Sequence, residues 1–421
     1  MEESKPVLRD QPIREEMKQK NAGGEGRTRR ILRDIGNLGN NAQQNQIPRP
    51  AKKPLIPAAA AAAAAKKPPP SPLPPQERSV IVISSDEKKK TTTKNNAGRM
   101  GYTSVLAARS RAAAGGGGAK KRPNKKKNER KNQVFEIDEG DVDNELAAVE
   151  YVDDIYKFYK LNEDEWRVKD YMRSQPEINS KMRSILVDWL IDVHKKFQLT
   201  PETLYLTVNL IDRFLAVRTV PRRELQLVGI GSMLIACKYE EIWAPEVADF
   251  IQISDKAYGR DQILAMEKTI LGFLEWYLTV PTPYVFLARY IKAAVAVAEE
   301  EEGKEELENM SFFLSELGLM DYATVVDFRP SMLAAAAVYA AGWTMKVVAV
   351  RRWTATLRHH TGYSEEEVAA CARKLVGLHS GVAKIKLKAA HRKFSSPDRG
   401  AVALFPPATA LLLTTAGARS S

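Results

Sequence analysis

The chain has 421 residues, of which 44% are hydrophobic, so it is long and apolar enough for two or three domains with cores of their own. Its net charge of +12 is unevenly distributed: residues 1–134 contain 30 basic and 11 acidic residues, whereas residues 135–421 contain 34 and 41. The basic excess therefore belongs to the N-terminal region. This distribution argues against a basic nucleic-acid-binding face on a fold formed by the rest of the chain, and we expect no direct nucleic-acid partner.

The cysteines and the apolar runs exclude further classes. Cys237 and Cys371 are far apart and lack a CxxC spacing, so they predict neither a metal site nor a disulfide framework, and they fit a reducing compartment. No apolar run reaches the roughly 18 residues that a membrane-spanning helix needs, and the first residues, Met1 to Lys5, do not form a secretory signal. We expect no membrane partner.

Residues 1–145 are predicted to form a long, basic and disordered regulatory arm. An alanine run at 58–65, a proline cluster at 68–75 and the glycines at 115–118 leave few side chains that could form a core. From Phe135 onward acidic residues become more frequent, and tyrosines begin to recur at helical spacing. Any function of the arm must therefore lie in short linear motifs.

The rest of the chain is predicted to be all-α, because helical periodicity dominates and strand signals are nearly absent. Proline and glycine mark the limits of most of the expected helices. Two leading helices are expected at 148–160 and 163–174. Five follow at about 181–197, 201–217, 221–240, 245–252 and 259–272, and four more near 283–297, 307–318, 330–347 and 364–378.

The helix expected at 181–197 is unusually apolar. At about 100° per residue its apolar side chains cover an arc of roughly 240°, whereas a helix on the surface of one domain needs a stripe little wider than 100°. The helix is therefore either wrapped by neighbours or serves two surfaces. Arg183 lies within the apolar arc and needs an acidic partner there, and we predict a structural ion pair with Asp212 of the next helix. Two separate solvated charges remain the alternative.

Several ordered blocks of this region resemble the cyclin family. The blocks are Met182-Arg183-Ser184-Ile185-Leu186-Val187-Asp188-Trp189-Leu190, Ile211-Asp212-Arg213-Phe214-Leu215, Leu225-Gln226-Leu227-Val228-Gly229, Ala236-Cys237-Lys238-Tyr239-Glu240-Glu241 and Met266-Glu267. Relatives usually have alanine where this chain has Ser184. The ending His194-x-Lys196-Phe197 resembles mitotic B-type cyclins, and the whole chain is most similar to plant members of that group.

The resemblance implies two consecutive five-helix cyclin-box repeats, the first at 146–280 with its leading helices and the second at 281–400, followed by a tail at 401–421. Two stretches depart from the family pattern: the acidic segment 299–306 looks longer than the usual link, and 342–352 fits poorly. The second repeat therefore departs further from the family pattern than the first.

The resemblance also implies a non-catalytic activator of a mitotic cyclin-dependent kinase, with Lys238 and Glu267 as kinase-binding residues. Their alternative reading is ordinary solvated helix charge. An enzyme is not supported by the residues themselves: there is no glycine-rich phosphate loop, Asp327-Phe328-Arg329 lacks a glycine, and the five histidines show no metal spacing. We expect no catalytic residues, metal or cofactor. The runner-up functions are a cyclin-fold transcription factor and a helical scaffold.

A substrate-docking groove is also implied by the resemblance. In related cyclins an exposed apolar groove docks protein substrates that carry basic-x-Leu motifs. Val187, Leu190 and Ile191 of the same helix would instead face the core. The alternative is that Trp189 is simply a core residue. The expected groove residues are Met182, Ile185, Leu186, Trp189, Asp192, Leu225 and Gln226.

Two motifs stand out in the arm. The stretch from Arg29 to Asn37 contains the complete form Arg-x-x-Leu-x-x-Ile-x-Asn, which resembles the destruction box that mitotic cyclins present to the anaphase-promoting ubiquitin ligase. Its expected residues are Arg29, Leu32, Ile35 and Asn37.

The second motif is a basic cluster that predicts nuclear import, with a merely solvated charge run as the alternative. We expect the protein in the nucleus, with an additional cytoplasmic pool as the alternative. The cluster consists of Lys120, Lys121, Arg122, Lys125, Lys126 and Lys127.

Overall fold

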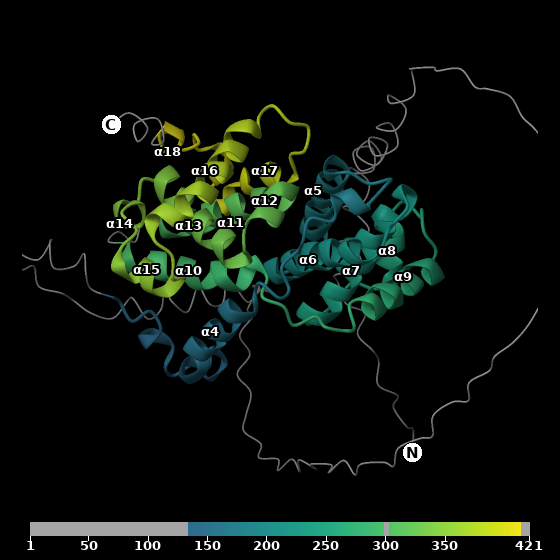
Figure 1. The fold of residues 1–421 in the computed structure, drawn as a ribbon, viewed down its shortest axis with the longest axis horizontal. Coiled ribbons are helices and arrows are strands. Elements are labelled where there is room, and N and C mark those ends of the chain that lie inside the picture. Colours follow the sequence, from purple (N-terminus) through teal and green to yellow (C-terminus); the bar gives the residue numbers. More distant parts are fainter. Residues whose placement is uncertain (1–133, 299–302, 414–421) are drawn as a thin grey trace, which may run out of the picture. The chain divides into compact units, whose positions relative to one another are not determined.

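The computed structural model describes residues 134–298 and 303–413, and all regular structure in these ranges is helical (Figure 1). The first repeat consists of α5 (Ser180–Phe197), α6 (Pro201–Val217), α7 (Leu225–Glu240), α8 (Val247–Ile253) and α9 (Arg260–Phe273). The predicted all-α class and the tandem arrangement are confirmed. Local signals fix the helix starts: the Asn179 side chain accepts a hydrogen bond from the Met182 N–H, and Pro201 occupies the first turn of α6.

The second repeat is more fragmented than predicted. Its long helices are α10 (Pro283–Val297), α11 (Lys304–Met320), α13 (Pro330–Thr344) and α16 (Glu365–Gly381). Between and after them lie short helices that the periodicity did not predict, since none is longer than seven residues. These are α12 (Tyr322–Asp327), α14 (Val348–Arg351), α15 (Ala355–Thr361), α17 (Ala389–Phe394) and α18 (Ala410–Leu413).

The packing of α14 on α13 explains the divergent sequence of residues 342–352. Helix α13 ends at Thr344, and α14 then packs back onto it through the fully buried Val350. A Cβ atom at Gly342 would lie 2.3 Å from a Val350 methyl group, so only glycine fits there. Helix α13 therefore stops three residues earlier than predicted.

Residues 163–179, which we call the strap, correct another prediction. A leading helix does form, as α4 (Val152–Asn162), but the strap contains only a short 3-10 turn at Met172–Ser174 instead of the helix expected at 163–174. Its backbone N–H groups at Tyr171 and Met172 donate to the Tyr322 hydroxyl, at 2.9 and 3.0 Å. Partners about 150 residues away replace the intrahelical bonds that a local pattern would predict.

Packing also extends past the predicted domain limits. At the N-terminal side, Ile137 is buried and Asp138 pairs with Arg289 of α10 at 2.6 Å, although 134–145 was assigned to the arm. At the C-terminal side, Val402 and Leu411 belong to the core of the second repeat, although 401–421 was predicted to be a tail. Apolar burial at these positions ties both segments to the folded part of the chain.

Helix α5 is wrapped by neighbours, which explains its wide apolar arc. It packs against α6 and α7 of its own repeat and against α11, α12 and α17 of the second. Apolar side chains on almost every side of α5 are therefore buried between the repeats. Among the described residues, no helix is long and apolar enough to cross a membrane.

Candidate functional site

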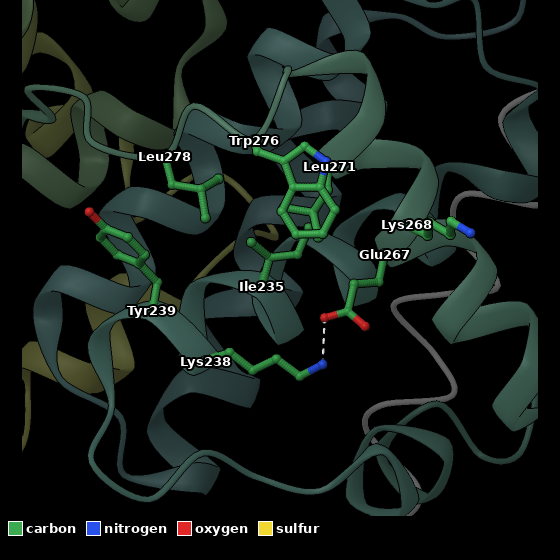
Figure 2. Close-up of a pocket in the computed structure, with 8 residues that line it drawn as sticks. All are labelled: Ile235, Lys238, Tyr239, Glu267, Lys268, Leu271, Trp276 and Leu278. Atoms are coloured by element: carbon green, nitrogen blue, oxygen red, sulfur yellow. Dashed lines mark hydrogen bonds and ion pairs between the residues drawn. The ribbon is translucent and has the colours of Figure 1, made fainter. Parts of the chain in front are cut away.

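Lys238 and Glu267 meet on the surface of the first repeat. Lys238 lies in the last turn of α7 and Glu267 in the middle of α9, and Lys238 Nζ is 2.6 Å from Glu267 Oε1 (Figure 2). Their side chains are 50% and 12% exposed. Because solvent screens such a pair, it contributes at most about 1 kcal/mol to folding. The pair is therefore available to a binding partner at little expense to stability.

An apolar hollow of about 500 Å³ lies beside this ion pair. Figure 2 shows its floor, formed by Ile235 of α7 and Leu271 of α9, with Trp276 at its edge. The Trp276 side chain is 67% exposed. An exposed tryptophan beside an apolar hollow is typical of a protein-binding surface. The remaining lining residues are Tyr239, Lys268 and Leu278.

A strained turn presents Trp276. Glu275 and Trp276 both have left-handed backbone angles, with φ of 53° and 60°, which non-glycine residues rarely adopt. The Trp276 N–H donates to the Leu271 carbonyl at 2.9 Å, and the ring of the next residue, Tyr277, stacks on Trp166 of the strap with centroids 4.0 Å apart. The surrounding contacts thus hold the tryptophan outward before any partner binds.

Helix α4 adds a second exposed apolar face. Its inner face packs Tyr156 and Tyr159 against Phe286 of α10, whereas Phe158 and Leu161 are exposed. Burial raises the pKa of Tyr159, and Tyr239 and Glu240 in the last turn of α7 raise it further. The exposed apolar side chains in these two helices and directly beside them are Tyr151, Ile155, Phe158, Leu161, Tyr239, Ile242 and Trp243.

Arg183 and Asp212 form a fully buried bidentate ion pair. Arg183 Nε and Nη2 each lie 2.6 Å from a different oxygen of Asp212, and the Tyr171 hydroxyl donates to the same carboxylate at 2.7 Å. Burial alone would lower the pKa of Arg183, but Asp212 raises it, so the guanidinium stays charged. Arg183 Nη1 also donates to the Leu319 carbonyl at the end of α11, at 2.9 Å. The pair therefore joins both repeats and the strap.

The expected substrate groove is not open in this structure. Met182, Ile185, Leu186 and Trp189 are 2%, 4%, 0% and 1% exposed, and Leu225 is buried as completely. They are as inaccessible as Val187, Leu190 and Ile191, which were expected to face the core. The open-patch prediction is therefore wrong for this structure, because the wide arc of α5 is covered.

The polar members of the expected groove are positioned differently. Asp192 pairs with Arg392 of α17, with 2.5 Å between Oδ2 and Nη2. The Trp189 indole N–H and the Gln226 amide nitrogen are buried, and neither has a hydrogen-bond partner in the part of the chain that the structure describes. Sequence analysis gave no sign of the Asp192–Arg392 contact, because α17 itself was not predicted.

The motifs of the arm lie outside the described residues. This holds for the destruction-box residues Arg29, Leu32, Ile35 and Asn37 and for the basic cluster at 120–127. Within residues 134–298 and 303–413, no group of three His, Cys, Asp or Glu side chains is arranged to hold a metal ion.

Sequence analysis missed the exposed aromatic residues of the site, although a signal was present. The segment Phe273-Leu274-Glu275-Trp276-Tyr277 places three aromatic residues just after an amphipathic helix, where a polar turn would be the usual choice. Such a cluster is a reason to suspect an interface.

The fold and the site together define a two-repeat helical protein-binding module. Family models agree with this class: the N-terminal domain of cyclins matches residues 154–279, and the C-terminal domain of cyclins matches residues 281–408. The chain belongs to the cyclin family.

Its curated relatives include plant mitotic B-type cyclins. G2/mitotic-specific cyclin S13-6 of Glycine max is 61% identical over 68% of this chain and 61% of its own length. Cyclin-B1-4 of Arabidopsis thaliana is 60% identical over 66% of this chain and 69% of its own length. G2/mitotic-specific cyclin S13-7 of Glycine max is 62% identical over 61% of this chain and 96% of its own length. The chain thus matches less than two thirds of the first of these proteins.

Proposed function

We propose that this protein is a non-catalytic regulatory subunit that binds and allosterically activates a mitotic cyclin-dependent kinase. The observation that carries the proposal is the Lys238–Glu267 pair beside an apolar hollow with an exposed Trp276. The names of the plant relatives, which describe mitotic cyclins, support the mitotic assignment. A charged pair next to an apolar anchor offers both orientation and affinity to a partner helix.

Activation follows from differential binding. A kinase needs its lysine–glutamate pair and its magnesium-binding aspartate in place together, and a partner that binds only this conformation increases its population. Shifting a two-state equilibrium from 1:99 to 99:1 takes about 5.5 kcal/mol of differential affinity. One buried tryptophan anchor contributes roughly 2–4 kcal/mol in such interfaces, so Trp276 together with the exposed Phe158 of α4 is sufficient in magnitude.

Co-purification and a kinase assay test this function. The full chain is mixed with a purified cyclin-dependent kinase, and binding and phosphorylation of histone are measured. We expect Lys238→Ala with Glu267→Ala to weaken binding and activation while leaving the helix content unchanged, because a solvent-screened pair contributes at most about 1 kcal/mol to stability. The double variant Lys374→Ala with Asp327→Ala removes a comparable pair, 3.1 Å apart, from the second repeat and serves as the control. A wild-type chain that neither binds nor activates the kinase would contradict the proposal.

Substrate recruitment through α5 is a separate part of the proposal. The buried donors of Trp189 and Gln226 have no described partner, and they could donate to backbone carbonyls of a basic-x-Leu peptide if the groove opens. The peptide's cation would compete with Arg392 for Asp192. We expect Gln226→Ala to lower the affinity of a fluorescent basic-x-Leu peptide without changing kinase activation. Unchanged affinity would remove this part of the proposal.

Regulated destruction and nuclear import complete the proposal, and both rest on sequence motifs alone. Arg29, Leu32, Ile35 and Asn37 would present the chain to the anaphase-promoting ubiquitin ligase, and the cluster at 120–127 would direct it to the nucleus. A fluorescent fusion lacking residues 120–127 tests the second point, since it should lose its nuclear enrichment.

A further inference from the structure

The short loop that follows α17 is anchored at both ends. Phe394, the last residue of α17, and Val402 beyond the loop are both buried in the second repeat. Between them, Ser396 is partly exposed, and Pro397 and Asp398 are exposed. The loop therefore presents a hydroxyl group at the surface between two fixed points.

The sequence of this loop is distinctive within the chain. In Ser396-Pro397-Asp398-Arg399 a hydroxyl residue is followed directly by proline and, at the third position, by a cation. The other hydroxyl–proline steps, at Ser71, Thr200 and Thr282, have no cation at that position. Thr200 and Thr282 also directly precede α6 and α10, whose first turns contain the prolines.

The geometry at Ser396 is compatible with recognition as a peptide. Its backbone is extended, with φ of −74° and ψ of 141°, and its hydroxyl donates to the Asp398 carboxylate. Three backbone hydrogen bonds hold the following 3-10 turn, among them Arg399 N–H to the Ser396 carbonyl at 3.0 Å. Gly400 and Ala401 have left-handed φ values of 62° and 49°, and Ala401 is strained by this conformation. Arg399 Nη1 also donates to the Asn309 side-chain oxygen at 3.3 Å, a long bond that Arg399 must release for recognition, and the strain at Ala401 favours opening of the turn.

We propose that Ser396 is a phosphorylation site for a proline-directed serine/threonine kinase. In the transfer, Ser396 Oγ forms a bond to the γ-phosphorus of ATP while the bond from that phosphorus to the bridging oxygen breaks and ADP leaves. The hydroxyl proton passes to the base of the kinase. Pro397 has no N–H to satisfy in the kinase cleft, and Arg399 supplies a charge-assisted contact three positions further on.

The modification would change the local contacts of the loop. A phosphorylated Ser396 cannot donate to Asp398 and places a second negative charge beside it. The hydrogen bond from Ser396 lowers the pKa of Asp398, and the charges of Arg399 and Lys195 lower it further. The site lies two residues after the end of α17, whose Arg392 and Lys393 pair with Asp192 of α5 and Glu316 of α11.

The test uses the full chain and a proline-directed kinase already assembled with its own activating subunit. The outcome then does not depend on whether this protein activates a kinase. After incubation with ATP, phosphopeptides are quantified by mass spectrometry. We expect phosphate on Ser396. In Arg399→Ala the rate of phosphorylation should fall at least about tenfold, since a charge-assisted hydrogen bond contributes about 1.5–3 kcal/mol. Pro397→Ala should lower the rate as well, whereas Ser395→Ala should leave it unchanged.

Two results would overturn the inference. One is an unmodified Ser396 in the folded chain when a synthetic peptide of residues 390–402 is phosphorylated, because the fold would then shield the site. The other is an equal rate at Ser396 in wild type and Pro397→Ala. Helix content, measured for each variant by circular dichroism, separates these results from misfolding.

Discussion

Arg183 shows at the residue scale how one buried charge organises the molecule. It bonds to Asp212 with two hydrogen bonds and to the Leu319 carbonyl with a third, all without exposure to solvent. Its cation also lies at the C-terminal end of α11, where the helix dipole favours positive charge. A single guanidinium therefore joins elements that are distant in sequence.

We expect Arg183→Met to destabilise the protein by about 3–5 kcal/mol, because it leaves Asp212 as an uncompensated buried charge. Chemical denaturation with circular dichroism measures this change. The double variant Arg183→Met with Asp212→Leu should recover much of the loss, since it removes both charges together. If Arg183→Met were as stable as wild type, the buried pair would have no organising role.

His194 gives a pH dependence at the same scale. Its side chain is buried, Nε2 lies 2.8 Å from the Thr200 carbonyl, and desolvation lowers its pKa to about 3. Below pH 6.5 the unfolded chain takes up a proton on this histidine that the folded protein does not. The corresponding stability is therefore present above pH 6.5 and is lost as the pH falls from 6.5 toward 3.

We expect His194→Gln to flatten the acid dependence of unfolding by about 1 kcal/mol per pH unit between pH 6 and 4. Urea denaturation at several pH values measures the slope for wild type and variant. His359→Gln, at an exposed position, is the matched control and should keep the wild-type slope. Equal slopes in all three proteins would show that His194 is protonated in the folded state.

Helix α4 illustrates the element scale, because its two faces have different tasks. The inner face is fixed by Tyr156, whose hydroxyl donates to the Val285 carbonyl at 2.9 Å and whose ring packs near Phe286. The outer face leaves Phe158 more than half exposed. One amphipathic element thus serves the core of the second repeat and the proposed kinase surface.

We expect Phe158→Ala to lower kinase affinity about tenfold while changing the free energy of unfolding by less than about 0.5 kcal/mol. Surface plasmon resonance with immobilised kinase and thermal unfolding measure the two effects. Tyr156→Ala, on the inner face, should change stability more than kinase affinity. We expect this variant to destabilise the fold by about 2 kcal/mol or more. A Phe158→Ala variant that binds like wild type would exclude the outer face from the interface.

At the scale of the whole molecule, the arm and the folded repeats should be separable. The proposed destruction motif lies about a hundred residues before the first described residue, Val134, so its removal should not disturb the core. We expect Arg29→Ala with Leu32→Ala to extend the lifetime of the protein through mitotic exit without changing kinase activation. A cycloheximide chase after release from mitotic arrest measures the lifetime. Unchanged turnover would assign degradation to another signal.

The sequence by itself determined the long helices and the class of the fold. Helix starts depend on local chemistry, such as Pro201, Pro283 and Pro330 in first turns and the capping box at Ser364, and these act within a few residues. It also paired Arg183 with Asp212, because a charge within an apolar arc allows few solutions.

Only the tertiary structure decided what depends on distant partners. The strap is not an α-helix because the Tyr322 hydroxyl accepts from its backbone, and α17 is fixed by pairs with α5 and α11. The burial of Trp189 has the same origin: the periodicity of α5 showed that its apolar arc is wide, but not that neighbours cover all of it. Periodicity reports which side chains are apolar, whereas burial depends on contacts between segments far apart in the chain.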